Sequence, residues 1–199
     1  MSFLSYLING VSLGSIYAII ALGYTMVYGI AKMLNFAHGD VIMIGAFVVL
    51  NALNVMNLPV IPAILVAVVG CTVLGVVIER VAYRPLRNAS SPLAVLITAI
   101  GVSYLLQNIA LLIFGADTVS FPNRITLPAL SLADGNLVIS SVTIVTIVAC
   151  IVIMAGLILF INKTKAGQAM LAVSEDKGAA QLMGINVDGT IALTFAIGS

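Results

Sequence analysis

Long apolar runs separated by short charged segments dominate the pattern along this chain. The charged residues leave uncharged stretches at 1–31, 41–78, 88–116, 135–162 and 189–199. A helix needs about 20 residues to cross about 30 Å of hydrocarbon. Several of these stretches are therefore long enough to hold a membrane-spanning helix.

The stretch from 41 to 78 is too long for one such helix, because it would extend roughly 57 Å. Asn57, Pro59 and Pro62 supply a turn, since proline lacks an amide proton and restricts the residue before it. That turn leaves only 41–56 for the second span. The span is either short or re-entrant, or it includes residues 33–40 and draws polar groups toward the membrane interior.

We therefore predict an all-α, polytopic membrane protein with five complete transmembrane helices and the start of a sixth. The five are expected near 6–31, 38–56, 60–78, 92–114 and 141–161. The last apolar run is too short to cross. We accordingly expect residues 1–199 to form a single transmembrane domain that is incomplete at its C-terminus.

Composition agrees with a membrane protein and excludes several classes. Hydrophobic residues make up 62% of the chain and charged residues 8%, against about 25% charged residues in soluble domains. A net charge of +1 argues against a nucleic-acid partner. Cys71 and Cys150 lie inside apolar runs, where we interpret them as packing residues rather than disulfide partners or ligands.

Basic residues indicate the orientation. Three arginines lie in 79–91 and three lysines in 162–188, whereas 115–140 holds one arginine. The positive-inside rule places the first two segments in the cytoplasm and the N-terminus in the periplasm. The arginines of 79–91 could also bind anionic lipid headgroups, although we favour the topological role.

Small residues suggest close helix packing. Ala63, Ala67, Cys71 and Gly75 recur at every fourth position of the third predicted span. Gly10 and the glycine four residues later form a similar pair in the first.

Polar residues mark a candidate pathway. Asn35, His38 and Asp40 lie at the junction of the first two apolar runs, and Gln107 and Asn108 lie inside the fourth. Ionisable groups near hydrocarbon are costly and often mark a substrate or proton pathway. Two alternatives stay open: Asp40 caps the second helix at its N-terminus, and the two amides hold helices together.

The segment 162–188 is the longest predicted cytoplasmic stretch. Ser174 is a credible N-cap and Gly184 a credible terminator, which predicts a short helix near 175–183.

Ala179, Leu182 and Met183 stand at helical spacing on this otherwise polar helix. They suit insertion into a groove on another protein, or packing against the chain's own spans.

No catalytic motif is evident. The sequence has no phosphate-binding loop, no zinc-ligand spacing and no nucleophile beside a histidine, and His38 is the only histidine. We expect no catalysis, no metal site and no cofactor in this chain. Active transport would then draw its energy from a partner or an ion gradient.

In combination, several segments resemble the permease subunits of bacterial high-affinity branched-chain amino acid ABC transporters. They are GVSLGSIYAIIALGYTMVYGI (10–30) with NFAHGD (35–40), ERVAYRPLR (79–87) with LITAIGVSYLLQN (96–108), and KTKAGQAMLAVSEDKGAAQLMGIN (163–186). The resemblance implies a subunit of the bacterial inner membrane that imports leucine, isoleucine and valine. It also implies a homologous second permease, two cytoplasmic subunits that bind ATP and Mg²⁺, and a periplasmic amino-acid-binding protein. A proton-coupled secondary transporter or a passive channel for small polar solutes is the alternative.

Importer permeases of this kind carry a cytoplasmic coupling sequence that begins Glu-Ala-Ala and reaches a glycine after three further residues. Gly178, Ala179, Ala180 and Gly184 occupy those positions here, with Gly178 in place of the usual glutamate. The resemblance favours contact of Leu182 and Met183 with an ATPase subunit.

Overall fold

A computed structural model describes the chain except for residues 1, 88–90, 122–129 and 133–136. Its contacts divide the chain into two compact units. One comprises Met1–Leu22 and Asn123–Gln168, and the other comprises Gly23–Pro122 and Ala169–Ser199. The single arginine and one of the two aspartates of the 115–140 segment, Arg124 and Asp134, lie outside the described residues.

The first unit contains two long apolar helices and a small sheet. The first 21 residues of α1 (Ser2–Ala31) belong to it, together with α5 (Ser141–Lys163). Strands β1 (Leu130–Leu132) and β2 (Leu137–Ile139) pair in antiparallel register, with Leu130 opposite Ile139. These two three-residue strands are a small exception in a chain whose other described elements are all helical, as the all-α prediction expects. Cys150 is a free, buried thiol that contacts the Ser15 carbonyl oxygen at 3.3 Å.

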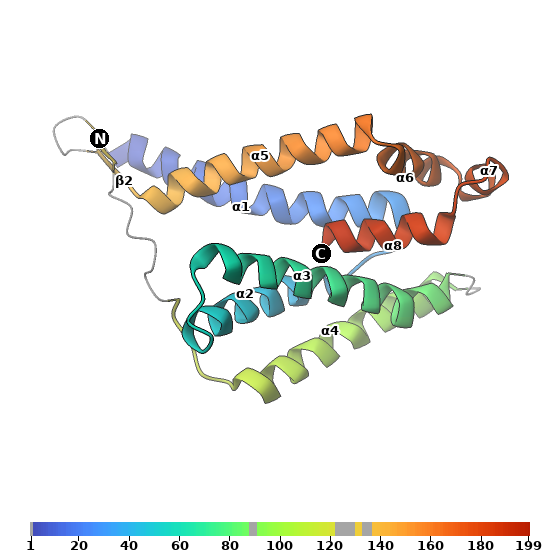
Figure 1. The fold of residues 1–199 in the computed structure, drawn as a ribbon, viewed down its shortest axis with the longest axis horizontal. Helices are drawn as coiled ribbons and strands as arrows, with labels where there is room; N and C mark the ends of the chain where they lie inside the picture. Colours follow the sequence, from blue (N-terminus) through green and yellow to red (C-terminus); the bar gives the residue numbers. More distant parts are fainter. Residues whose placement is uncertain (1, 88–90, 122–129, 133–136) are drawn as a thin grey trace. The chain divides into compact units, whose positions relative to one another are not determined.

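The second unit is built around α3 (Val60–Ile78), which packs against both α2 (His38–Asn54) and α8 (Val187–Gly198) (Figure 1). α3 continues into a π-helical turn, η1 (Glu79–Tyr83), and a 3₁₀ turn, η2 (Arg84–Leu86). α4 (Pro92–Phe114) packs against α2. α7 (Lys177–Leu182) precedes α8, and α6 (Lys165–Glu175) begins in the first unit and enters the second at Ala169.

Among the described residues, four helices are long and apolar enough to cross a membrane: Phe3–Ala31, Val60–Leu86, Leu93–Phe114 and Ser141–Lys163. The chain is thus a polytopic membrane protein. The second predicted span corresponds to α2, whose 17 residues are fewer than a full crossing requires. It begins at His38 and so incorporates both His38 and Asp40. It ends before a turn in which Asn57 has φ 48° and Pro59 precedes α3.

The small residues of α3 allow close helix packing, as their spacing predicts. Ala63, Ala67, Cys71 and Gly75 are all buried. A Cβ at Gly45 of α2 would lie 2.8 Å from the Cys71 sulfur, so these backbones are close. In α1, by contrast, no described atom lies within 4 Å of the place where a Cβ would stand at Gly10, nor at the glycine four residues on.

Gly75→Val is expected to destabilise the second unit, because a Cβ there would stand 2.9 Å from the Phe195 carbonyl oxygen of α8. Overpacking of this kind costs about 1–3 kcal/mol. The measurement is the free energy of unfolding of the full chain in detergent micelles. Gly70→Val is the matched control, since nothing lies within 4 Å of its Cβ position on the same helix. Equal losses in both variants would contradict the close α3–α8 packing.

Candidate functional site

The end of α3 forms a junction where polar residues concentrate. Over Glu79–Tyr83 the helix widens to π geometry, a form found frequently at functional sites. Pro85 lies in the 3₁₀ turn that follows, and the helix ends at Leu86. Glu79 and Tyr83 are both buried in this turn, although the turn lies beyond the end of the predicted apolar span.

Tyr83 connects this junction to the first polar motif. Its hydroxyl donates to Asn35 Oδ1 at 3.0 Å, and its ring lies 5.2 Å from that of Phe195 in α8. Both Tyr83 and Asn35 are buried. The sequence predicts a site role for Asn35 but not for Tyr83. The only indication for Tyr83 is that this tyrosine lies in an arginine-rich segment.

His38 is buried in the first turn of α2. Its ring centroid lies 6.1 Å from that of Tyr24. A Cβ at Gly23 would stand 3.0 Å from His38 Cε1. Gly23 therefore provides the space that the imidazole occupies.

Asp40 joins α2 to α4. The Ser103 hydroxyl donates to its carboxylate at 2.5 Å and the Gln107 amide at 2.9 Å. The predicted N-cap position of Asp40 is wrong, since Ala37 occupies the N-cap of α2 without a side-chain bond, whereas the predicted interaction with the helix dipole agrees with the structure. Asp40 instead lies in the first turn, where the helix dipole favours its negative charge.

Asn108 is not brought to this group. Its amide donates to the Tyr104 carbonyl oxygen of its own helix at 2.7 Å, and its side chain is exposed. Of the two amides in the fourth span, only Gln107 reaches α2.

Asp40→Ala is expected to lower the free energy of unfolding by about 3 kcal/mol, because hydrogen bonds to a charged group contribute about 1.5–3 kcal/mol each. Denaturant unfolding of the full chain in micelles measures the loss. Asn108→Ala is the control and should change stability little, since its bond stays within one helix. Indistinguishable unfolding of the Asp40 variant and the natural chain would show that the α2–α4 bridge contributes nothing.

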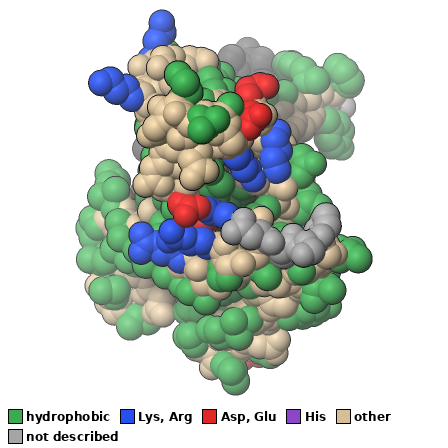
Figure 2. Space-filling model, turned by 90° about the vertical axis from the view of Figure 1, so that its right-hand side faces the viewer, with side chains coloured by type: hydrophobic (Ala, Val, Ile, Leu, Met, Phe, Trp, Pro, Cys, Tyr) green, Lys and Arg blue, Asp and Glu red, His purple; other side chains and the backbone are tan. Residues whose placement is uncertain are grey.

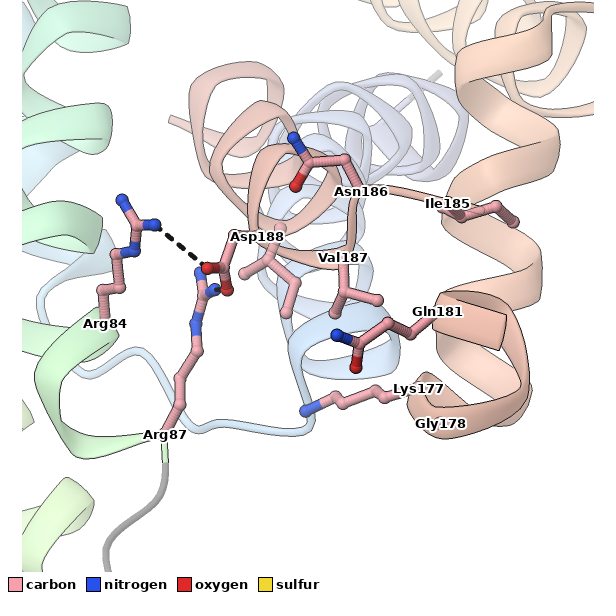
Figure 3. Close-up of a pocket in the computed structure, with 10 residues that line it drawn as sticks. Arg84, Arg87, Lys177, Gly178, Gln181, Ile185, Asn186, Val187 and Asp188 are labelled. Atoms are coloured by element: carbon pink, nitrogen blue, oxygen red, sulfur yellow. Dashed lines mark hydrogen bonds and ion pairs between the residues drawn. The ribbon is translucent and has the colours of Figure 1, made fainter. Parts of the chain in front are cut away.

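A second cluster joins α8 to the junction. Arg84 pairs with Asp188 at 3.0 Å, and Arg87 pairs with both Asp188 and the buried Glu79. Figure 3 shows Asp188 pointing toward the two arginines. Lys177 of α7 donates to the Ala31 carbonyl oxygen at 2.7 Å. It thereby places a cation at the C-terminus of α1, where the helix dipole favours positive charge.

Arg84, Arg87, Lys177 and Asp188 line a pocket of about 530 Å³. Figure 2, which looks at the right-hand end of Figure 1, shows acidic side chains touching basic ones on this face. Two of the three arginines of 79–91, Arg84 and Arg87, make ion pairs with Asp188 across 104 and 101 residues of sequence. One sequence feature could have indicated this pairing. An aspartate stands at the start of an apolar run, on the side of the membrane where the arginines are also predicted to lie.

The pKa values of Asp188 and Lys177 are both shifted in this cluster, but for different reasons. Partial desolvation opposes ionisation of Asp188, but the bonds and charges of Arg84 and Arg87 outweigh it and lower its pKa. The pKa of Lys177 is also lowered, first by burial and then by the charges of Arg87 and Lys32. Asp188 is therefore stabilised as an anion, whereas Lys177 lies in an excess of positive charge.

The predicted helix near 175–183 is α7, and its cap differs from the prediction. Asp176 Oδ1 accepts from the amides of Gly178 and Ala179 at 2.7 and 3.0 Å. Ser174 is not the N-cap; it lies in α6, where its hydroxyl donates to the Leu171 carbonyl oxygen. Gly184 has φ +82° and ends the helix, as predicted.

The apolar residues of α7 divide into two sets. Ala180 is buried and its carbonyl oxygen accepts from the Ile185 amide at 3.0 Å. Leu182 and Met183 are 90% and 82% exposed, and Ala179 is exposed as well. Leu182 and Met183 thus lie on the surface of the second unit.

No group of three or more His, Cys, Asp or Glu side chains among the described residues is placed to hold a metal ion.

Long apolar helices with charged residues gathered at their ends define a multi-pass membrane protein. Comparison with known proteins identifies the family to which it belongs. A family model described as "Branched-chain amino acid transport system / permease component" matches residues 6–199. The chain belongs to this family of transport permeases.

Two similar relatives are named high-affinity branched-chain amino acid transport system permease proteins: LivH of Escherichia coli, 44% identical, and BraD of Pseudomonas aeruginosa, 42% identical. Each alignment covers 99% of this chain and 67% of the relative. A probable LivH of Methanocaldococcus jannaschii is 32% identical over 86% of this chain and 55% of its own length. No solved structure matches the chain.

Proposed function

We propose that this chain is the permease subunit of an ATP-driven importer of leucine, isoleucine and valine in the bacterial inner membrane. The family and the names of its relatives support the substrate class. The observation that carries the ATP-driven mechanism is α7, which exposes two large apolar side chains, Leu182 and Met183, at the tip of a polar segment. Those side chains suit a groove on a motor subunit.

The contacts of α7 supply a route by which such a motor would move the membrane helices. Lys177, the first residue of α7, bonds the end of α1. Five residues after Met183, Asp188 pairs with Arg84 and Arg87 beyond the end of α3. Movement of α7 would therefore pull on α1 and α3 together. In this proposal the chain transmits motion and performs no bond chemistry.

ATP and Mg²⁺ would be bound by two cytoplasmic partner subunits, with 79–91 and 162–188 in the cytoplasm and the N-terminus in the periplasm. A homologous second permease would complete the pathway, and a periplasmic binding protein would deliver the amino acid. Residues 1–199 would act as one transmembrane domain, with α2 as a short second span and α8 as the start of a sixth.

The substrate pathway would use the polar groups around α2. Asn35, His38 and Asp40 are buried there, and Gln107 reaches Asp40 from α4. A buried carboxylate in an apolar bundle suits the ammonium group of a zwitterionic solute. Asn108 would contribute from the exposed side of α4 instead.

Uptake by the full-length chain with its partner subunits tests the proposal. Labelled leucine should accumulate only with ATP present, and excess isoleucine or valine should compete where glutamate or urea does not. Uptake that persists without ATP and stops when the proton gradient is collapsed would favour the secondary transporter. Competition by glutamate or urea would contradict the substrate class.

A further inference from the structure

A second pocket, of about 500 Å³, shares Arg87 and Lys177 with the first. Its charged lining residues are Lys32, Arg87 and Lys177, so all are cations. Glu79 and Asp188, the carboxylates that pair with Arg87, do not line it. The pocket is therefore a positively charged site on the described part of the chain.

The two lysines carry charge that the described residues do not neutralise. Neither Lys32 nor Lys177 forms an ion pair with a described carboxylate. Lys177 uses one of its three N–H donors on the Ala31 carbonyl oxygen, which leaves two for a further acceptor. The lowered pKa of Lys177, caused by burial and by the neighbouring cations, agrees with a site that lacks an anion.

Apart from the hydroxyl-bearing Tyr28 and Ser91, the rest of the pocket wall is apolar. Leu34, Leu86, Leu93 and Leu96 line it, and Leu93 is 64% exposed. A free anion such as phosphate would make no favourable contact with these apolar side chains. A ligand with an anionic head and hydrocarbon chains would cover both parts.

The position of the pocket fits the boundary between hydrocarbon and water. Three candidate spans terminate in its lining: one ends at Ala31, one ends at Leu86, and one begins at Leu93. The ends of membrane spans lie at the depth of lipid headgroups. Basic pockets between helices at this depth are a known form of headgroup site.

We propose that this pocket binds an acidic diacyl phospholipid. The phosphate lies among Lys32, Lys177 and Arg87, and the acyl chains lie along Leu93 and Leu96. This site is separate from the substrate pathway, and the inference does not depend on which solute the protein transports.

Lipid retention by the full-length protein, purified in nonionic detergent and delipidated, tests the site. The probes are phosphatidylglycerol and phosphatidylethanolamine, counted by native mass spectrometry. We expect tighter retention of phosphatidylglycerol. Lys32→Gln should weaken it about fivefold, because one basic residue near the surface contributes about 1 kcal/mol.

Lys165→Gln is the matched control, since it removes an exposed lysine that does not line the pocket. Leu96→Trp should also reduce phosphatidylglycerol retention by filling the space for an acyl chain. Equal effects of the two lysine variants, or equal retention of the two lipids, would overturn the proposal. So would displacement of phosphatidylglycerol by an equal concentration of glycerol phosphate, which would show an anion site without acyl contacts.

Discussion

The double substitution Leu182→Glu and Met183→Glu is expected to abolish ATP-driven uptake without impairing folding or membrane insertion. Both side chains are almost fully exposed in the chain alone, so their loss removes no internal packing. In the assembled transporter they would be buried in a motor subunit. Burial of each contributes about 1.5–3 kcal/mol, so losing both should weaken binding of the ATP-binding subunits by about 100-fold or more.

Copurification of the ATP-binding subunits, together with leucine uptake, measures this effect. Gln181→Glu is the control, since it adds a negative charge to an exposed position of the same short helix and leaves both apolar side chains in place. Normal copurification and uptake by the double variant would show that the motor contacts another part of the chain. If both variants lost copurification and uptake, the added negative charge alone would account for the effect.

Arg87→Ala is expected to be the most destabilising change at the junction that follows α3. Glu79 is only 1% exposed and Arg87 11%, and they pair directly. Removing one partner of a buried ion pair costs about 3–5 kcal/mol, because the other charge is left buried and uncompensated. The free energy of unfolding of the full chain in micelles gives the measured loss.

Arg84→Ala is the matched control. Its pair with Asp188 is about half exposed on both sides, and such pairs contribute at most about 1 kcal/mol. The combined variant Glu79→Gln with Arg87→Gln should recover part of the stability, since it buries no unpaired charge. Similar losses in the two single arginine variants would show that burial of the Glu79 pair does not govern this junction.

Local sequence signals located most helix boundaries closely. The prediction of 92–114 coincides with α4, because Pro92 fits the first helical turn and Gly115 adopts φ +84° at the end. The prediction of 60–78 coincides with α3, which Pro59 precedes. Such boundaries depend on a few neighbouring residues, and the sequence displays those directly.

The N-cap of α7 could not be predicted from neighbouring residues alone. Ser174 and Asp176 are both good capping residues, and the choice depends on backbone geometry. Asp176 is extended, with φ −149° and ψ 115°, whereas Ser174 stays in helix α6. No composition rule separates the two.

The polar contacts of the site were beyond prediction for a different reason. Asp40 meets Gln107 across 67 positions of sequence, and Arg84 meets Asp188 across 104. These pairs depend on how the helices pack. The sequence identified Asp40 and Gln107 as costly polar residues near hydrocarbon, but it could not show that they bond each other.

The π-helical turn at Glu79–Tyr83 makes this segment sensitive to length. Each residue of an α-helix turns the chain by about 100° and advances it about 1.5 Å. A π turn holds about one residue more than an α turn for the same rotation, so return to regular α geometry with the same number of residues would rotate Arg84 and Arg87 about a quarter-turn away from Asp188. Homologous permeases that share the arginine–aspartate bridge should therefore either keep both the π turn and the number of residues before Arg87, or lose the π turn together with one residue.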